Sequence, residues 1–366
     1  MLQSRRLYQA IGVVGATLCL TVSLLLLFPR LLFWNVLPDF TIFWTAGRIA
    51  LQDAQQVYDI AALTGEQSWA VSPSRGPRPF PYPPTTLLLF IPFGLIPFWA
   101  AYWSWLLLGL VAFWSAARRV ATGWAVPLSL ATPHVTLALI LGQLTLIVGA
   151  MVIWCVTLLR DRPVAAGIIL GLAAAIKPHS VLLAPIALVS GGGHRKALAV
   201  AAVTLVAVCL ASLTLGVEAW RAWLFALQAF PSTMEWHALY RLGATPSMAG
   251  QSLGLDPWIV SVLYAASIAA GAGAVWMAFK TDDLTVRLLT LVIGSLFASP
   301  YGMRYDLAMI APVLTMGLLS GRLRGLLVSV PLFALYSVTI LPALLVSLSA
   351  ELSRRRRPQP LIGRLA

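Results

Sequence analysis

Carboxylates are scarce in this sequence, and one of them stands where it could act on a bound molecule. The 366 residues include 12 Asp and Glu against 25 Lys and Arg, and 60% of them are apolar. Asp39 follows Pro38 and precedes an aromatic segment with helical spacing. An Asp at this position can cap the helix by accepting hydrogen bonds from its first free N–H groups. It can equally have a chemical role, and the two roles are compatible, because a helix N-terminus also positions a carboxylate at the membrane surface.

Lys177 is the second candidate, because it interrupts an apolar stretch over residues 164–190. A lysine at membrane depth is costly and marks a functional site by default, although it can also snorkel to the interface. Pro178 breaks the helix beside it, and the backbone groups freed there need a cavity or a partner. His179 is the other ionisable group in the stretch. The sequence predicts two short helices with a functional lysine at their joint.

Arg304 and Asp306 lie two residues apart in a turn between two apolar runs. They fit an Arg–Asp pair on the surface, or alternatively Arg304 faces an anionic ligand. His134 and His237 are isolated, and no group of His, Cys and carboxylates has the spacing of metal ligands. The sequence also lacks a phosphate-binding glycine loop. We therefore expect neither a metal site nor a bound cofactor.

The elements that position these residues must be membrane helices. Charged residues make up 10% of the chain, against about 25% in soluble domains, which excludes a soluble globular enzyme, a disordered chain and a disulfide scaffold. The composition predicts an all-α polytopic integral membrane protein, a single unit over residues 1–366 with about nine to thirteen spans. The net charge of +13 is attributed to cytoplasmic turns, so we expect a lipid bilayer and no nucleic acid as partner.

Basic residues also predict the orientation of the chain. Residues 10–28 form an uncleaved first helix, which places the N-terminus in the cytoplasm and the loop over 29–84 outside. A second outer loop is expected over 218–257, and residues 351–366 form a basic tail. The turns around Arg160 and Arg195 are expected inside. Between residues 85 and 141 the number of crossings stays open, and with it the side of Arg118.

The outer loop over 29–84 is expected to contain an amphipathic helix that lies at the interface. Its predicted faces are an apolar one with Phe40, Phe43, Trp44, Gly47 and Leu51, and a polar one with Thr41, Thr45, Arg48 and Gln52.

Several short motifs together resemble glycosyltransferase family 87, whose members are membrane enzymes with the C-type glycosyltransferase fold. They are the run from Pro38 to Arg48, the segment Val57-Tyr58-Asp59, the run from Phe80 to Pro84, and the later motifs Gly142-Gln143, Lys177-Pro178 and Ser299-Pro300-Tyr301. The resemblance covers roughly residues 10–320. The family that the sequence resembles includes the polyprenol-phosphate-mannose-dependent mannosyltransferases of actinobacteria. One departure is the segment Arg304-Tyr305-Asp306, where the mannosyltransferase branch often carries His.

The resemblance implies transfer of a hexose or pentose from a polyprenyl-phosphate sugar to a lipid or glycan acceptor at the outer face of the cell membrane. Asp39 is then the general base of an inverting reaction, and cations stabilise the leaving phosphate. The candidates for the phosphate are Lys177, Arg304 and His179, and those for the sugar or acceptor are Tyr82, Gln143, Asp59, Tyr301 and Asp306. Phe43, Trp44 and Tyr301 fit a prenyl groove or, more simply, anchors at the interface.

A transporter or lipid flippase is the competing class, because broken helices at Pro133 and Pro178 also suit a transport path. The absence of inverted halves in the sequence argues against it, and a purely structural subunit would leave Asp39 and Lys177 unexplained.

Overall fold

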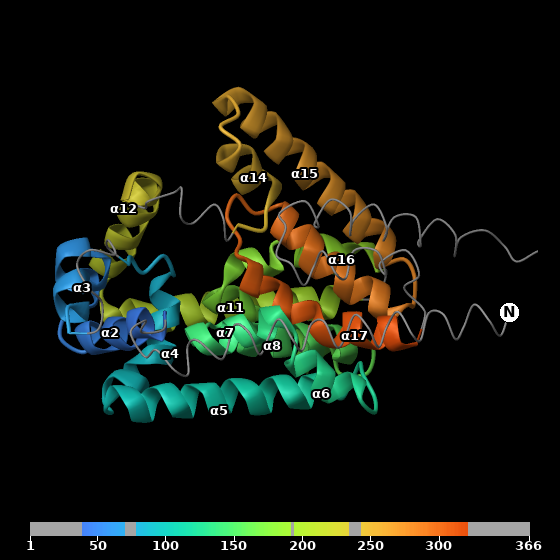
Figure 1. The fold of residues 1–366 in the computed structure, drawn as a ribbon, viewed down its shortest axis with the longest axis horizontal. Coiled ribbons are helices and arrows are strands. Elements are labelled where there is room, and N and C mark those ends of the chain that lie inside the picture. The colour runs from blue at the N-terminus through green and yellow to red at the C-terminus, as the bar shows by residue number, and fades with distance from the viewer. Residues whose placement is uncertain (1–38, 70–77, 192–193, 234–242, 321–366) are drawn as a thin grey trace, which may run out of the picture.

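The protein is described by a computed structural model that covers residues 39–69, 78–191, 194–233 and 243–320 (Figure 1). The expected first helix over 10–28, the basic tail over 351–366 and His237 lie outside these residues. Within them the secondary structure is helical, apart from one isolated antiparallel bridge between Gly243 and Met303.

The first half of the described chain forms short helices around one long one. The elements are α2 (Phe40–Ala50), η1 (Ala54–Tyr58), α3 (Ile60–Gln67), α4 (Pro84–Gly94), α5 (Phe98–Ala117), α6 (Ala125–Leu130), α7 (Pro133–Leu141), α8 (Thr145–Leu158) and α9 (Pro163–Ile176). Proline begins α4, α7 and α9, where its missing N–H has no helical partner to lose. The breaks predicted at Pro133 and Pro178 are confirmed.

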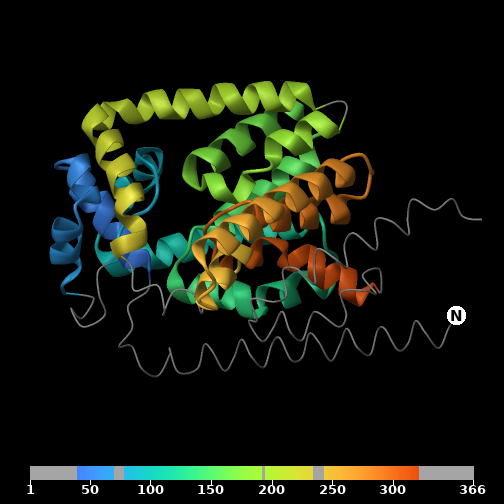
Figure 2. The same cartoon turned by 90° about the horizontal axis from the view of Figure 1, so that it is seen from above.

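The second half contains two more long helices. The elements are η3 (Pro178–Val181), α10 (Ala184–Ser190), α11 (Arg195–Ser212), η4 (Leu213–Leu215), α12 (Val217–Thr233), α14 (Pro246–Ser252), α15 (Pro257–Ala278), α16 (Leu284–Phe297), η5 (Arg304–Ile310) and α17 (Ala311–Leu319). Much of the predicted loop over 218–257 is helical, because it contains α12 and α14. Figure 2 shows α12 turning away from the end of α11 toward α3.

Three helices are long and apolar enough to cross a membrane, namely Phe98–Ala117, Arg195–Leu215 and Pro257–Ala278. Five shorter apolar helices accompany them in the described residues. This composition fits a membrane protein, and the count of about nine to thirteen spans stays a prediction.

The helices run between two ends of the molecule, which we call the Asp39 end and the basic end. The Nε atom of Arg119 donates to the Thr157 hydroxyl at 2.8 Å, so the ends of α5 and α8 meet. The start of α8 lies instead beside Asp306, which Thr145 contacts at 2.9 Å. Because α8 is about 21 Å long, Arg118 and Gln143 lie at opposite ends. The basic end comprises Arg118, Arg119, Arg160, Arg162, Arg195, Lys196 and Lys280.

The stretch over 164–190 is a hairpin rather than one broken span. Gly167 packs on Ala197 and Val200, and Gly171 packs on Ala201 and Thr204, so α9 and α11 run parallel from the basic end. α10 must therefore return to that end before α11 begins. At this end burial, and then the charge of Arg287, lower the pKa of the His194 imidazole. The turns around Arg160 and Arg195 thus share one end, as their charges predicted.

The helix after Asp39 is enclosed by protein and is not amphipathic in the predicted way. Thr41 and Thr45, expected on a polar face, are completely buried, while Leu51 on the supposed apolar face is exposed. Phe43 and Trp44 are also buried, so they are core residues and not interface anchors. Phe43 stacks on Phe90 of α4 with ring centroids 4.6 Å apart. α4 packs on the predicted apolar face through Phe43 and Gly47, yet the predicted polar face is buried as well. The prediction failed because the local pattern does not show that both faces are covered.

Candidate active site

Asp39 does not cap α2, so this predicted role is wrong. Its backbone dihedrals are helical (φ −59°, ψ −15°) and its side chain makes no capping hydrogen bond, whereas a capping residue needs an extended backbone. The carboxylate instead accepts from Nε2 of Gln143 at 2.8 Å and from the Arg78 guanidinium at 3.2 Å. About a quarter of the Asp39 side chain is exposed. It is therefore oriented by two donors and accessible from outside the protein.

Gln143 is brought to Asp39 by the turn that ends α7. Gly142 adopts a left-handed conformation there (φ 66°), which favours glycine, and an added Cβ would lie 2.6 Å from that of Phe40. Trp105 fixes the turn by donating to the Gly142 carbonyl at 3.0 Å. The Oε1 atom of Gln143 is buried and has no hydrogen-bond partner among the described residues. That acceptor, beside a carboxylate, is suited to bind a hydroxyl group.

Arg78 and Tyr82 come from the segment that precedes α4. The Tyr58 hydroxyl donates to the Tyr82 carbonyl at 3.0 Å, and Trp223 of α12 donates to the Pro81 carbonyl at 3.2 Å. These two bonds hold the segment in place on both sides. Burial raises the pKa of the Tyr82 phenol, and the charges of Tyr301, Asp306 and Asp39 raise it further. The phenol thus stays protonated near both carboxylates.

Lys177 and Asp306 form a buried ion pair, and each side chain is only 1% exposed. The same Asp306 oxygen accepts from the Thr145 hydroxyl at 2.9 Å, and its other oxygen accepts from the Met303 N–H at 3.0 Å. The expected surface pair between Arg304 and Asp306 is therefore wrong, because the turn directs Asp306 inward. The ammonium expected to face a ligand already has a carboxylate partner.

The helix break beside Lys177 is capped by two threonines of α4. Thr85 donates to the Ala175 carbonyl at 2.5 Å, and Thr86 donates to the Ile176 carbonyl at 3.0 Å. Helical partners for these carbonyls are lost when the helix ends before Pro178. The cap joins the break directly to the segment that carries Tyr82.

His179 and Tyr301 border the buried pair. Nε2 of His179 lies 4.0 Å from Asp306, and its ring meets that of Tyr301 edge-on at 6.3 Å. Burial raises the pKa of Tyr301, and the charges of Asp306 and Asp39 raise it further. Arg304 begins η5 and is half-buried. The structure thus gathers Asp39, Gln143, Tyr82, Tyr301, His179, Lys177 and Asp306 from five segments.

A family comparison matches residues 80–300, more than half of the chain, to glycosyltransferase family 87. The chain belongs to glycosyltransferase family 87. No curated protein and no solved structure matches it. Membership makes this protein a membrane glycosyltransferase and decides against a transporter. The matched region includes Tyr82, Gln143, Lys177 and His179 but not Asp39, whose role rests on its geometry.

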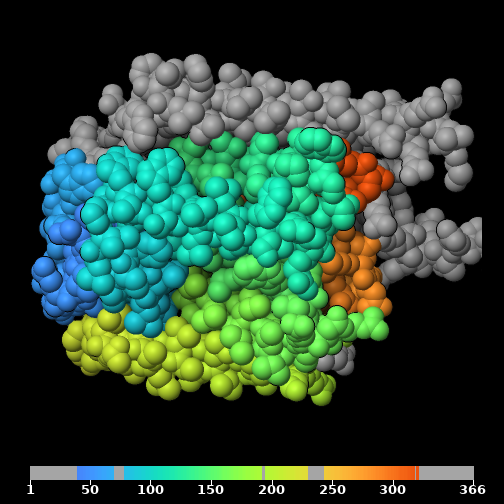
Figure 3. All heavy atoms as spheres, turned by 90° about the horizontal axis from the view of Figure 1, so that it is seen from below, coloured from blue at the N-terminus to red at the C-terminus, as the bar shows by residue number. Residues whose placement is uncertain are grey.

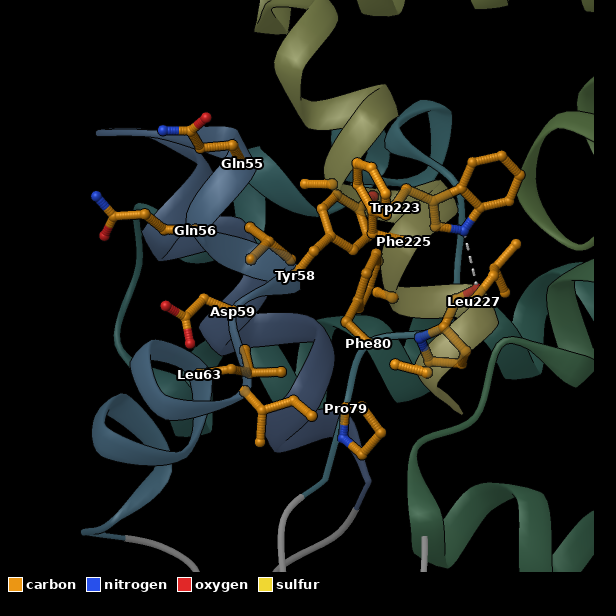
Figure 4. A pocket seen from close by; sticks show the side chains of 16 residues that line it. Gln55, Gln56, Tyr58, Asp59, Leu63, Pro79, Phe80, Trp223, Phe225 and Leu227 are labelled. Carbon is orange, nitrogen blue, oxygen red and sulfur yellow. Dashed lines mark hydrogen bonds between the residues drawn. The ribbon is translucent and has the colours of Figure 1, made fainter. Parts of the chain in front are cut away.

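Asp59 lies apart from this site in the family 87 protein. Its carboxylate caps α3 by accepting from the Ala61 N–H at 2.8 Å. It borders a pocket of about 540 Å³ between η1, the segment 79–81 and α12. Figure 4 shows the side chains of Gln55 and Gln56 pointing away from the rings of Tyr58 and Trp223, so the pocket is mainly apolar. Asp39 does not line it.

Sequence analysis missed three residues of the site, which are Arg78, Thr145 and Tyr305. A basic residue in a loop assigned to the outside opposes the charge rule, and this conflict was a usable signal for Arg78. Thr145 carried no such signal, because it begins an ordinary apolar helix. Tyr305 carried none either, because its role comes from a tertiary contact: the Lys177 ammonium lies 5.2 Å from the centroid of its ring. The described residues hold no group of three or more potential metal ligands.

Proposed function

We propose that this family 87 enzyme transfers a hexose or pentose from a polyprenyl-phosphate sugar to a lipid or glycan acceptor. The observation that carries the proposal is the Asp39 carboxylate, which is partly exposed and oriented by Gln143 and Arg78 rather than used as a helix cap. The lack of a phosphate-binding glycine loop in the sequence supports a lipid-linked donor over a nucleotide sugar.

Asp39 takes the proton of the acceptor hydroxyl as its oxygen attacks the anomeric carbon. The bond between that carbon and the phosphate oxygen breaks, and its electron pair leaves with polyprenyl phosphate. Attack opposite to the leaving group inverts the anomeric centre. One carboxylate is sufficient for this step, because the proton is all that the base removes.

The leaving phosphate gains negative charge, which cations must stabilise. We assign this role to Arg78 and Arg304, because one guanidinium group can bind two phosphate oxygens at once. His179 is a further hydrogen-bond donor. Lys177 has a different role here, since its charge is balanced by Asp306. It holds the turn that carries Tyr301 and Arg304 against the break that carries His179. Gln143, Tyr82 and Tyr301 are placed to contact sugar or acceptor hydroxyls.

The charge distribution supports an outward-facing site. The basic end would lie in the cytoplasm, which leaves the Asp39 end at the outer face of the cell membrane. A donor already carried across on a lipid would be available there. Asp59 and its apolar pocket would then border the outer leaflet, where a lipid acceptor could enter.

The test is sugar transfer by the purified enzyme from a panel of synthetic polyprenyl-phosphate sugars. Asp39→Asn should lower turnover about 10²- to 10⁴-fold with the best donor, because the amide cannot take a proton. Asp53→Asn is the matched control, since Asp53 is an acidic residue of the same region that caps η1, and Asn caps about as well as Asp. Full activity of Asp39→Asn, or transfer only from nucleotide sugars, would contradict the proposal.

A further inference from the structure

The outward face of α5 carries a stripe of exposed apolar side chains that ends in arginines. Trp103, Leu107, Val111 and Trp114 are all exposed, and their spacing of three or four residues places them in one row. Arg118 continues the row one turn later and is followed by Arg119, and both are exposed. In Figure 3, where α5 crosses the face shown, its side chains lie open to view.

A shallow pocket lies where this stripe meets the arginines. Its volume is about 660 Å³, and it is formed by the last turns of α5 together with Leu130 of α6. Leu110, Val111 and Trp114 supply its apolar wall, and Arg118 and Arg119 supply its charged rim. An apolar wall beside a cationic rim is complementary to an amphiphile with an apolar chain and a negatively charged head group.

The charge of this rim is not balanced within the described residues. None of their ion pairs includes Arg118 or Arg119. Arg119 gives its Nε–H to Thr157, which leaves most of its five donors for another acceptor. The carbonyl end of α5 contributes only about half a negative charge, so two guanidinium groups leave a positive site.

We propose that this pocket binds an anionic phospholipid, with its phosphate between Arg118 and Arg119 and an acyl chain along the stripe. Arginine pairs with phosphate through two parallel hydrogen bonds. Trp114 lies one turn before Arg118 and is exposed, and tryptophans of membrane proteins are enriched at the level of the head groups. The site is at the basic end, a full helix length from Asp39. The proposal therefore holds or fails independently of the proposed reaction.

The experiment measures which lipid the purified full chain retains in detergent. The protein is equilibrated with equal amounts of phosphatidylglycerol and phosphatidylcholine, and native mass spectrometry counts the bound lipids. The parent protein should prefer phosphatidylglycerol. Each lost arginine should lower its retention about fivefold, because a basic residue near an anionic lipid contributes about fivefold in affinity. Arg118→Gln/Arg119→Gln should then lower it about 25-fold.

Arg160→Gln/Arg162→Gln is the matched control, because it removes the same charge from the same end without touching the pocket. Arg118→Gln alone preserves the Arg119–Thr157 bond, so a loss in this variant is not due to misfolding. An equal loss in the two double variants would overturn the proposal in favour of a diffuse positive surface. A parent protein without preference for phosphatidylglycerol would overturn it as well.

Discussion

Asp39 and Asp306 have opposite environments, and the proposed reaction assigns them different roles: Asp39 is the base and Asp306 is structural. Asp306 is enclosed and accepts from Lys177, Thr145 and the Met303 backbone. Asp39 is partly exposed and receives two donors from segments that approach it from different directions. A base must reach a substrate hydroxyl, so the exposed carboxylate is the one suited to catalysis.

The buried pair leads to a prediction about stability. Lys177→Gln should lower the free energy of unfolding by about 3–5 kcal/mol, because it leaves the Asp306 charge buried without its partner. Lys177→Gln/Asp306→Asn should recover more than half of that loss, since both members are then neutral and still bond to each other. The measurement is thermal unfolding of the detergent-solubilised variants.

Additive losses in the double variant would mean that the two side chains do not interact. The donor dependence of transfer gives a second test of Lys177. Suppose that Lys177→Gln raises the donor KM strongly while its unfolding temperature equals that of the parent protein. The lysine then contacts the donor phosphate, as the sequence analysis expected.

At the scale of elements, α9 and α11 are in contact because two small residues allow it. Gly167 and Gly171 lie four residues apart, and an added Cβ at Gly171 would be 2.6 Å from both the Ala201 carbonyl and the Thr204 side chain. Small residues with this spacing let membrane helices approach closely. The contact fixes the hairpin whose tip carries Lys177.

A larger residue at this contact should therefore separate the helices. Gly171→Leu should destabilise the protein by more than about 1–3 kcal/mol, the usual cost of overpacking, and should lower activity by displacing the Lys177 break. Gly273→Ala is the control, because this glycine in α15 has open space where a Cβ would lie. Unfolding temperatures in detergent compare the two, and equal values would show that the α9–α11 contact contributes little.

The helices were predictable from local signals, and their contacts were not. Apolar runs and prolines define where α4, α7 and α9 begin, and Lys177-Pro178 marks the break, because these effects act within a few residues of the chain. The burial of Thr41 depends on tertiary packing, and the pairing of Asp306 depends on Lys177, a residue more than a hundred positions away. Periodicity records which side of a helix is apolar, but it does not record what covers the other side.

At the scale of the whole molecule, chemistry and charge are separated along the helices. Asp39, Gln143 and the Lys177 break lie at one end, while the arginines that follow α5 and α8 lie at the other, where Arg119 contacts Thr157. The number of crossings between residues 85 and 141 stays a prediction, but the structure shows at which end of the helices Arg118 lies. α6 and α7 return the chain from Arg118 to Gln143, so Arg118 belongs with the other basic turns.

This separation predicts the accessibility of single cysteines in intact cells. Charged turns remain in the cytoplasm, so a membrane-impermeant thiol reagent should modify Gln56→Cys, which is exposed near Asp39, but not Lys196→Cys at the basic end. Both variants are made in a background in which Cys19, Cys155 and Cys209 are replaced, so that the introduced thiol is the only target. Opening the cells with detergent should make Lys196→Cys reactive, which controls for its local exposure. The reverse pattern in intact cells would place Asp39 in the cytoplasm, where a sugar donor of the outer leaflet could not reach it, and it would contradict the proposed reaction while leaving the fold intact.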